Sequence, residues 1–129
     1  MQFPTNLKYS KEHEWVRLEG NKAVVGITDF AQSQLGDVVF VELPTLGAVA
    51  VAGKRFSVVE SVKAVSDIFA PVNGTVVEIN DTLNDAPEKV NQDPYGQGWI
   101  AVLELTDAAG LTELMDSEAY AAQVAKGGH

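Results

Sequence analysis

The hydrophobic residues of this chain fall in short runs separated by turn-forming residues. Valine, isoleucine and aromatic residues are concentrated in segments 15–18, 23–27, 38–41, 76–79 and 99–105. Each run is shorter than a typical helix and is followed, within a few residues, by glycine, proline, asparagine or aspartate. This pattern predicts a series of β-strands, of which the first two form a hairpin across residues 19–22.

Two helices are predicted from the residues at their ends. The first spans residues 29–35, where Thr28 can cap the start of the helix and Gly36 can end it. The second spans residues 118–126 and follows Asp116 and Ser117, either of which is a suitable cap. The predicted fold class is therefore mostly β, with a short helix in the N-terminal half and helices at the C-terminus.

Two further features refine this picture. A helical turn is predicted around residues 111–115, whereas residues 80–98 are predicted to form a long loop because they are rich in Asp, Asn, Pro and Gly. Residues 36–41 (GDVVFV) also resemble residues 74–79 (GTVVEI). Two similar halves suggest two sheets related by a pseudo-twofold axis.

Lys63 lies between these two similar segments, within a stretch that is nearly free of charge. Valine, phenylalanine and isoleucine occur on both sides of it, and the nearest acids are Glu60 and Asp67. Because both flanks favour strand, the chain is expected to reverse direction at the lysine, and a hairpin tip would present its amine to another protein. The tip lacks an Asn-Gly signal, but a type I turn tolerates these residues. Considered alone, a lysine in a turn is most simply a solubility residue.

Length and charge exclude several function classes. A chain of 129 residues fits one domain with a hydrophobic core. Its formal net charge of -9 disfavours binding to nucleic acids and to anionic membranes. No apolar run approaches the roughly 20 residues that span a bilayer, and the N-terminus lacks the pattern of a signal or transit peptide.

The chain also lacks the groups on which most enzymes depend. It has no cysteine, which excludes disulfides, thiolate catalysis and cysteine-bound metals and fits a reducing cytoplasm. Its histidines are His13 and His129, so a histidine-based catalytic group or zinc site is very poorly supplied. We therefore expect neither catalytic residues nor a metal site.

Several segments match one known pattern. They are Lys8-Tyr9-Ser10, His13-Glu14-Trp15, Val25-Gly26-Ile27-Thr28, Ala31-Gln32, Leu35-Gly36-Asp37, Val39-Phe40-Val41-Glu42-Leu43-Pro44, Glu60-Ser61-Val62-Lys63-Ala64, Ser66-Asp67, Pro71, Gly74, Val90-Asn91, Pro94-Tyr95-Gly96 and Gly98-Trp99. On these residues the chain resembles the H proteins of the glycine cleavage system, which are relatives of the lipoyl domains of 2-oxoacid dehydrogenase complexes. The His-Glu-Trp and Pro-Tyr-Gly-x-Gly-Trp segments are similar to H proteins rather than to the lipoyl domain of an acyltransferase.

The resemblance implies a lipoyl-domain-like β-sandwich, also described as a barrel-sandwich hybrid. It implies a single lipoyl-carrier domain over residues 1–129, with an N-terminal extension of about 1–30, a lipoyl core of about 31–106 and a helical tail of about 107–129. It also implies a non-catalytic carrier with one lipoic acid in amide linkage to Lys63. Biotin is disfavoured because Val62 and Ala64, rather than methionines, flank the lysine.

The partners implied by the resemblance are four enzymes of the bacterial cytoplasm. A pyridoxal-phosphate glycine decarboxylase would load an aminomethyl group onto the carrier, and a tetrahydrofolate-dependent aminomethyltransferase would remove it. A dihydrolipoamide dehydrogenase would then receive the electrons, and a lipoylating enzyme would attach the cofactor. A role as lipoyl donor in a relay, or as an unmodified β-sandwich interaction module, is the alternative.

Three acidic residues are further candidates for the site. Glu14 and Asp67 are candidates for docking the cationic cargo, because a sheltered ammonium group needs a carboxylate. Glu60 and Asp67 give the tip a charge pattern that a modifying enzyme could recognise. The competing interpretation is that these are solvated surface acids, those beside Lys63 protecting an exposed β edge. His13 is expected to be a hydrogen-bonded surface residue, and Trp15, Tyr95 and Trp99 are expected to be core or loop anchors.

Overall fold

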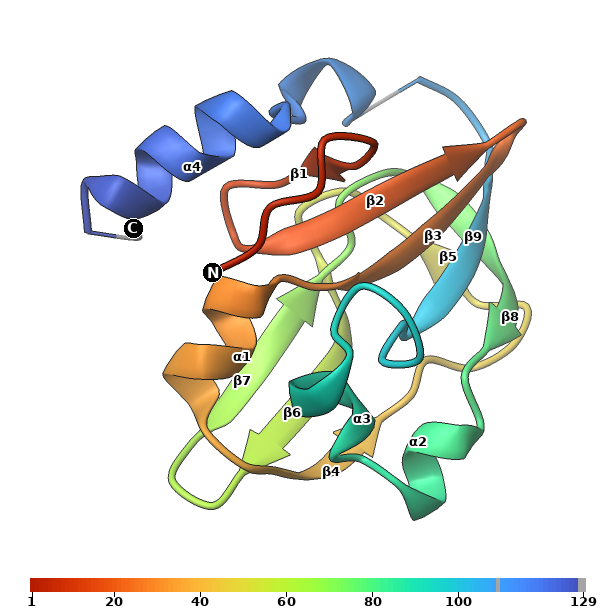
Figure 1. Cartoon of the computed structure of the whole chain (residues 1–129). Helices are drawn as coiled ribbons and strands as arrows, with labels where there is room; N and C mark the ends of the chain where they lie inside the picture. The colour runs from red at the N-terminus through yellow and green to blue at the C-terminus, as the bar shows by residue number, and fades with distance from the viewer. Residues whose placement is uncertain (109, 128–129) are drawn as a thin grey trace.

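The computed structural model describes residues 1–108 and 110–127, and it contains two antiparallel sheets (Figure 1). The six-stranded sheet has the order β1 (Lys8–Tyr9), β2 (Glu14–Glu19), β3 (Lys22–Ile27), β9 (Ala101–Leu105), β8 (Gly74–Ile79) and β5 (Val49–Ala50). The three-stranded sheet has the order β4 (Val38–Glu42), β6 (Arg55–Ser61) and β7 (Val65–Phe69). The predicted strands and the mostly-β fold class are confirmed.

The helices lie at the ends of strands and over the outside of the larger sheet (Figure 1). They are α1 (Asp29–Leu35), α2 (Thr82–Asp85), α3 (Lys89–Gln92), the 3-10 turn η1 (Leu111–Glu113) and α4 (Ser117–Ala125). As predicted, the Thr28 side chain accepts a hydrogen bond from the backbone N–H of Ala31, and Gly36 ends α1 with a φ of 78°. Asp116 is the cap of α4, since its side chain accepts from the N–H of Ala119.

The core forms on both faces of the six-stranded sheet because its strands alternate. Val16 and Val25 lie on the face of this sheet that is turned toward the three-stranded sheet, where they pack with Val76 and Leu103. The residues next to them in sequence, including Trp15, point to the opposite face. There they pack against Tyr9 of β1 and Tyr120 of α4, so the C-terminal helix covers a face that would otherwise be an exposed apolar surface.

The segment 80–98 differs from the loop that its composition predicts, because it contains α2 and α3. Each is a single helical turn that buries one apolar side chain, Leu83 in α2 and Val90 in α3. Helices this short have no hydrophobic periodicity, so tertiary burial of their one anchor stabilises them.

The two similar segments lie in different sheets, since residues 38–41 belong to β4 and residues 74–79 form β8. The pseudo-twofold relation and the divisions near residues 30 and 106 stay predictions. The end of the predicted tail, including His129, falls outside the described residues. Within residues 1–108 and 110–127, no helix is long and apolar enough to cross a membrane.

Candidate functional site

Lys63 lies at the tip of the hairpin formed by β6 and β7, as its flanking sequence predicts. Glu60 pairs with Val65 across the hairpin, and the backbone N–H of Ser61 donates to the carbonyl of Ala64 at 2.8 Å. The Ser61 hydroxyl oxygen also accepts from the N–H groups of Ala64, at 3.1 Å, and of Lys63, at 3.3 Å. The side chain of Ser61 therefore closes the turn, and the exposed Lys63 side chain extends from a short, hydrogen-bonded loop.

The tip is also fixed to the segment between α1 and β4. The N–H of Val62 donates to the carbonyl of Asp37 at 3.0 Å. The aliphatic stem of Lys63 runs beside Gly36, so that a β-carbon at Gly36 would lie 3.4 Å from Cε of the lysine. The lysine is thus held near the end of α1, although its amine remains exposed.

Asn91 of α3 holds this segment in place. Its Nδ2 donates to the carbonyl of Gly36 at 2.8 Å, and its Oδ1 accepts from the N–H of Val38 at 2.8 Å. A single amide side chain therefore satisfies both sides of the turn that supports Lys63. Asn91 belongs to the family pattern seen in the sequence, but that pattern does not indicate what its side chain does.

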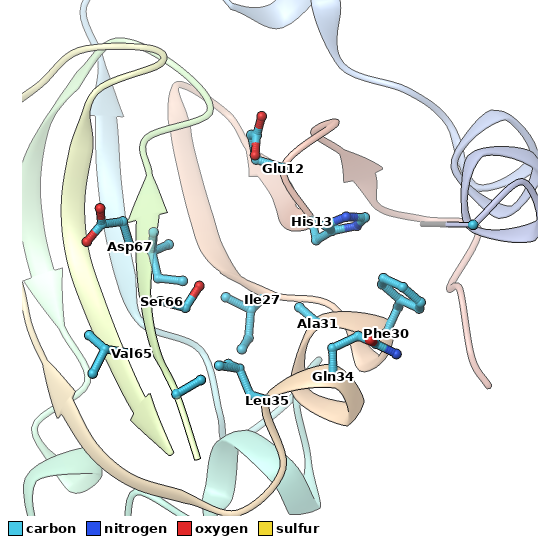
Figure 2. Close-up of a pocket in the computed structure, with 13 residues that line it drawn as sticks. Glu12, His13, Ile27, Phe30, Ala31, Gln34, Leu35, Val65, Ser66 and Asp67 are labelled. Carbon is cyan, nitrogen blue, oxygen red and sulfur yellow. The ribbon is translucent and has the colours of Figure 1, made fainter. Parts of the chain in front are cut away.

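A cavity of about 390 Å³ opens beside the hairpin tip (Figure 2). Its walls are the loop before β2, the end of β3 with helix α1, and strand β7, and Gly127 after α4 also lines it. The lining residues are Glu12, His13, Ile27, Phe30, Ala31, Gln34, Leu35, Ala64, Val65, Ser66, Asp67, Ile68 and Gly127. The cavity reaches Ala64, the residue next to Lys63, and its lining combines apolar residues with the acidic residues Glu12 and Asp67.

Asp67 borders this cavity from β7, where it lies opposite Val58. Figure 2 shows its carboxyl group on the side of the strand away from Ile27 and Leu35, since side chains alternate along a strand. Its ion pair with Arg55 is 3.7 Å long, and the side chains are 51% and 60% exposed, respectively. Such an exposed pair contributes little energy, so Asp67 can exchange this partner for another cation. Glu60 is half-buried on β6 and is not among the residues that line the cavity.

Glu14 is not a surface acid, because its side chain is only 1% exposed. The Ser10 hydroxyl donates to one carboxyl oxygen, and the N–H of Phe69 donates to the other at 3.3 Å. Burial raises the pKa of Glu14 to about 7, against the opposing effect of these hydrogen bonds. Glu14 therefore bridges β2 of one sheet and β7 of the other.

Glu14 and Asp67 line different cavities. Glu14 borders a second cavity of about 260 Å³ that also includes Ser10, Phe69 and Pro71. The interpretation of both acids as solvated surface residues is wrong for Glu14 and consistent with the exposure of Asp67. Glu12 shares the larger cavity with Asp67, although its position in the sequence gives no sign of a site residue.

The histidine and the aromatic residues have the structural contacts expected of them. His13 is half-buried, and its Nδ1 lies in a hydrogen bond of 2.8 Å with the Tyr120 hydroxyl. The indole N–H of Trp15 donates to the carbonyl of Pro94 at 2.9 Å, and the Tyr95 hydroxyl donates to the carbonyl of Gln2 at 2.7 Å. No group of three or more His, Cys, Asp and Glu side chains in residues 1–108 and 110–127 could hold a metal ion.

The wall formed by α1 was missed because it looks structural in the sequence. Phe30, Ala31, Gln34 and Leu35 recur at the spacing of one helix face. That spacing indicates that the four side chains lie on one face of the helix, but it does not indicate that this face lines a cavity.

Comparisons with known proteins agree with this geometry. The family model for "Glycine cleavage H-protein" matches residues 7–127. The glycine cleavage system H protein of Brevibacillus brevis is 60% identical over 124 residues, which cover 96% of this chain and 98% of that protein. That of Bacillus subtilis is 56% identical over 120 residues, which cover 93% of this chain and 94% of that protein.

Solved structures give the same result. The crystal structure of a glycine cleavage system H protein from Mycobacterium marinum superimposes with a TM-score of 0.87 and 38% identity. The match covers 95% of this chain and 98% of that structure. The fold is therefore the β-sandwich of that protein, and the chain belongs to the glycine cleavage H-protein family.

Proposed function

We propose that the protein carries lipoic acid in amide linkage to Nζ of Lys63. The observation that supports this site is an exposed lysine side chain at the tip of a hydrogen-bonded hairpin, beside a cavity of about 390 Å³. An exposed amine fits an acylation that a separate enzyme performs, because that enzyme must reach the nitrogen. A rigid anchor also presents the lysine at a defined position, which a mobile loop would not do.

As a member of its family, the protein is a non-catalytic carrier of the glycine cleavage system. The attached lipoyl group supplies a dithiolane that can accept both a one-carbon unit and electrons. A tether on a lysine stem raises the effective concentration of the carried group at each enzyme without releasing it. The specific partners of this proposal are the glycine decarboxylase, the aminomethyltransferase, the dihydrolipoamide dehydrogenase and a lipoylating enzyme.

The proposed location is the cytoplasm of a bacterium, which is supported by the bacterial relatives. The most direct test of the carrier role is glycine-dependent bicarbonate exchange with a purified glycine decarboxylase. Lipoylated protein should support the exchange, and the same protein without lipoate should not. Equal rates with both forms would contradict the carrier proposal. A lipoyl transfer assay to a second apoprotein tests the relay role, which uses the same lysine.

The acids beside the tip have separate proposed roles. Asp67 docks the cationic cargo at the edge of the cavity, because its exposed carboxyl group lies on the strand that forms one wall. Glu14 supports the docking of the cargo indirectly, because it accepts a hydrogen bond from the N–H of Phe69 on the buried side of β7. Glu60, which pairs with Val65 next to the turn, is proposed as a recognition residue for the lipoylating enzyme.

Replacing Asp67 with asparagine should speed the spontaneous loss of the carried aminomethyl group while leaving lipoylation unchanged. The amide keeps the shape of the side chain but removes the charge that pairs with an ammonium group, so we expect release to be faster by about three- to tenfold. The measurement is the rate of amine release from loaded protein after the decarboxylase is removed.

Glu42→Gln is the matched control for this experiment. Glu42 is an exposed acid on β4 of the same sheet, but it does not line the cavity, so its variant should release the cargo at the wild-type rate. Wild-type rates in both Asp67→Asn and Glu14→Ala would remove these two residues from the proposed site and leave Lys63 alone.

The lipoylated protein should be a good substrate for glycine decarboxylase and a poor one for pyruvate dehydrogenase. Recognition is expected to use surface beyond the hairpin, including β1, β2 and α4, which are the additions at the two ends of the chain. The measurement compares initial rates of glycine-dependent exchange and of pyruvate-dependent reductive acylation at equal carrier concentrations. Efficient acylation by pyruvate dehydrogenase with no response to glycine decarboxylase would sink this proposal.

A further inference from the structure

Tyr120 lies at the centre of the contact between the C-terminal helix and the start of the chain. Its side chain is fully buried and stacks on Tyr9, with ring centroids 4.7 Å apart and planes 6° from parallel. Phe3 meets the same ring edge-on at 5.4 Å. Figure 1 shows α4 lying beside β1 and the N-terminal segment. These contacts fix where the Tyr120 hydroxyl can point.

The Tyr120 hydroxyl adds a side-chain connection between the loop before β2 and the start of α1, which also meet directly because the N–H of Thr28 donates to the carbonyl of His13 at 3.1 Å. It lies 2.8 Å from Nδ1 of His13 and 2.7 Å from Oγ1 of Thr28, both within hydrogen-bond distance. The same Thr28 oxygen caps α1 by accepting from the N–H of Ala31 at 3.1 Å. One buried hydroxyl group therefore reinforces the junction between the loop before β2 and the first turn of α1.

A second contact from α4 supports the same loop. Nε2 of Gln123 donates to the carbonyl of Lys11 at 3.0 Å. His13 has a φ of 73°, a conformation that is uncommon for a residue with a side chain. Such a residue stays in place when its surroundings hold it there, and the contacts to Tyr120 and Gln123 provide that support.

The loop before β2 and helix α1, which Tyr120 contacts, both line the larger cavity. Glu12 and His13 line it from the loop, and Phe30, Ala31 and Gln34 line it from α1 (Figure 2). Tyr120 itself is not among the lining residues. An effect of Tyr120 on the contents of the cavity would therefore act through the positions of its walls, which include Gly127 just after α4.

We propose that Tyr120 is a positioning residue that holds two walls of the cavity at a fixed separation and so sets how firmly the carried group is sheltered. This inference rests on the proposed function, because it concerns the cavity in which the cargo docks. It assigns a task to the C-terminal helix, which covers the face of the larger sheet opposite the smaller sheet and is followed by Gly127 at the cavity.

The first test uses protein without lipoate and compares Tyr120→Phe with Tyr9→Phe. Both variants remove one hydroxyl from the same stacked pair, but the Tyr9 hydroxyl donates to Pro4 and touches neither wall. Amide hydrogen exchange at Ala31 and across residues 10–13 should be about fivefold faster in Tyr120→Phe, the size expected for one lost hydrogen bond. It should match wild type in Tyr9→Phe. Equal exchange in the two variants overturns the proposal.

The second test uses loaded, lipoylated protein. Tyr120→Phe should release the carried aminomethyl group several-fold faster than Tyr9→Phe, while the initial rate of lipoylation at Lys63 stays at the wild-type value in both. In a Thr28→Val background, Tyr120→Phe should cause no further increase in the release rate. The reason is that both changes break the same connection, the hydrogen bond between the Thr28 and Tyr120 hydroxyl groups. Full additivity of the two changes overturns the proposed route through Thr28.

The two tests separate this inference from the proposed function. Faster exchange at the walls with unchanged release, in a wild-type protein that does shelter its cargo, overturns the link between Tyr120 and the cargo. A protein that is not lipoylated at Lys63 contradicts the proposed function in the mass spectrum, and the exchange experiment still decides whether Tyr120 holds the walls.

Discussion

Replacing Lys63 with arginine should abolish lipoylation and all carrier activity while leaving the fold intact. A guanidinium group keeps the positive charge but does not act as the acylation nucleophile. The side chain is exposed in a turn, so the free energy of unfolding should change by less than about 0.5 kcal/mol. The measurements are the intact mass after expression with lipoate, the glycine-dependent bicarbonate exchange rate and the urea unfolding midpoint.

Lys54→Arg is the matched control for this substitution. Lys54 is also exposed and lies just before β6, at the far end of the strand that leads to the hairpin tip. Its variant should be lipoylated and active like the wild type. Lipoylation that persists on another lysine in Lys63→Arg would falsify the assignment of the attachment site.

The position of Lys63 could be predicted because its signals are local. The β-forming residues on both sides determine a hairpin, and a hairpin places its middle residue at the tip whatever the rest of the fold does. The same holds for α1, where Thr28 and Gly36 act within one turn of the backbone. Local hydrogen bonds of this kind are set by neighbours in sequence, so the sequence alone reveals them.

The cavity beside Lys63 could not be predicted, because distant segments form it. Its lining comes from the loop before β2, from α1 and from β7. One contact that supports these walls links His13 to Tyr120, which are 107 positions apart. No capping residue or periodicity reports such a contact, and Tyr120 looks like any apolar-face residue of a short helix.

The burial of Glu14 was missed for a related reason. A glutamate beside a histidine at the start of a strand is typical of a solvated strand end, and charged residues are rarely fully buried unless they are paired. The partners of Glu14 are the Ser10 hydroxyl and the N–H of Phe69, 55 positions away. The Ser10 contact could have been inferred from the sequence, because the two residues are four positions apart. The Phe69 contact depends on how the two sheets pack.

The buried Glu14 should make the stability of the protein fall as the pH rises. Burial raises the pKa of this carboxyl group from 4.5 to about 7 in the folded protein. Between these two values the folded protein keeps a proton that the unfolded chain has lost, so folding is favoured at the lower pH. The contribution is largest below about pH 4.5, declines up to about pH 7 and is then constant.

The size of this effect follows from the two pKa values. A pKa that rises from 4.5 to about 7 corresponds to about 3 kcal/mol over the whole range, of which about 2 kcal/mol falls between pH 5 and pH 8. Other groups titrate in the same range, so the informative quantity is a difference between variants. Glu14→Gln stays neutral at every pH, and its amide can still accept from the N–H of Phe69 and donate to the Ser10 oxygen.

Relative to wild type, Glu14→Gln should therefore gain about 2 kcal/mol in the free energy of unfolding between pH 5 and pH 8. Urea unfolding at both pH values measures this change, and Glu78→Gln, which alters an exposed acid on β8, should show no such gain. A difference between Glu14→Gln and wild type that is the same at pH 5 and pH 8 would contradict the raised pKa. It would mean that the hydrogen bonds from Ser10 and Phe69 stabilise the buried carboxylate enough to offset its desolvation.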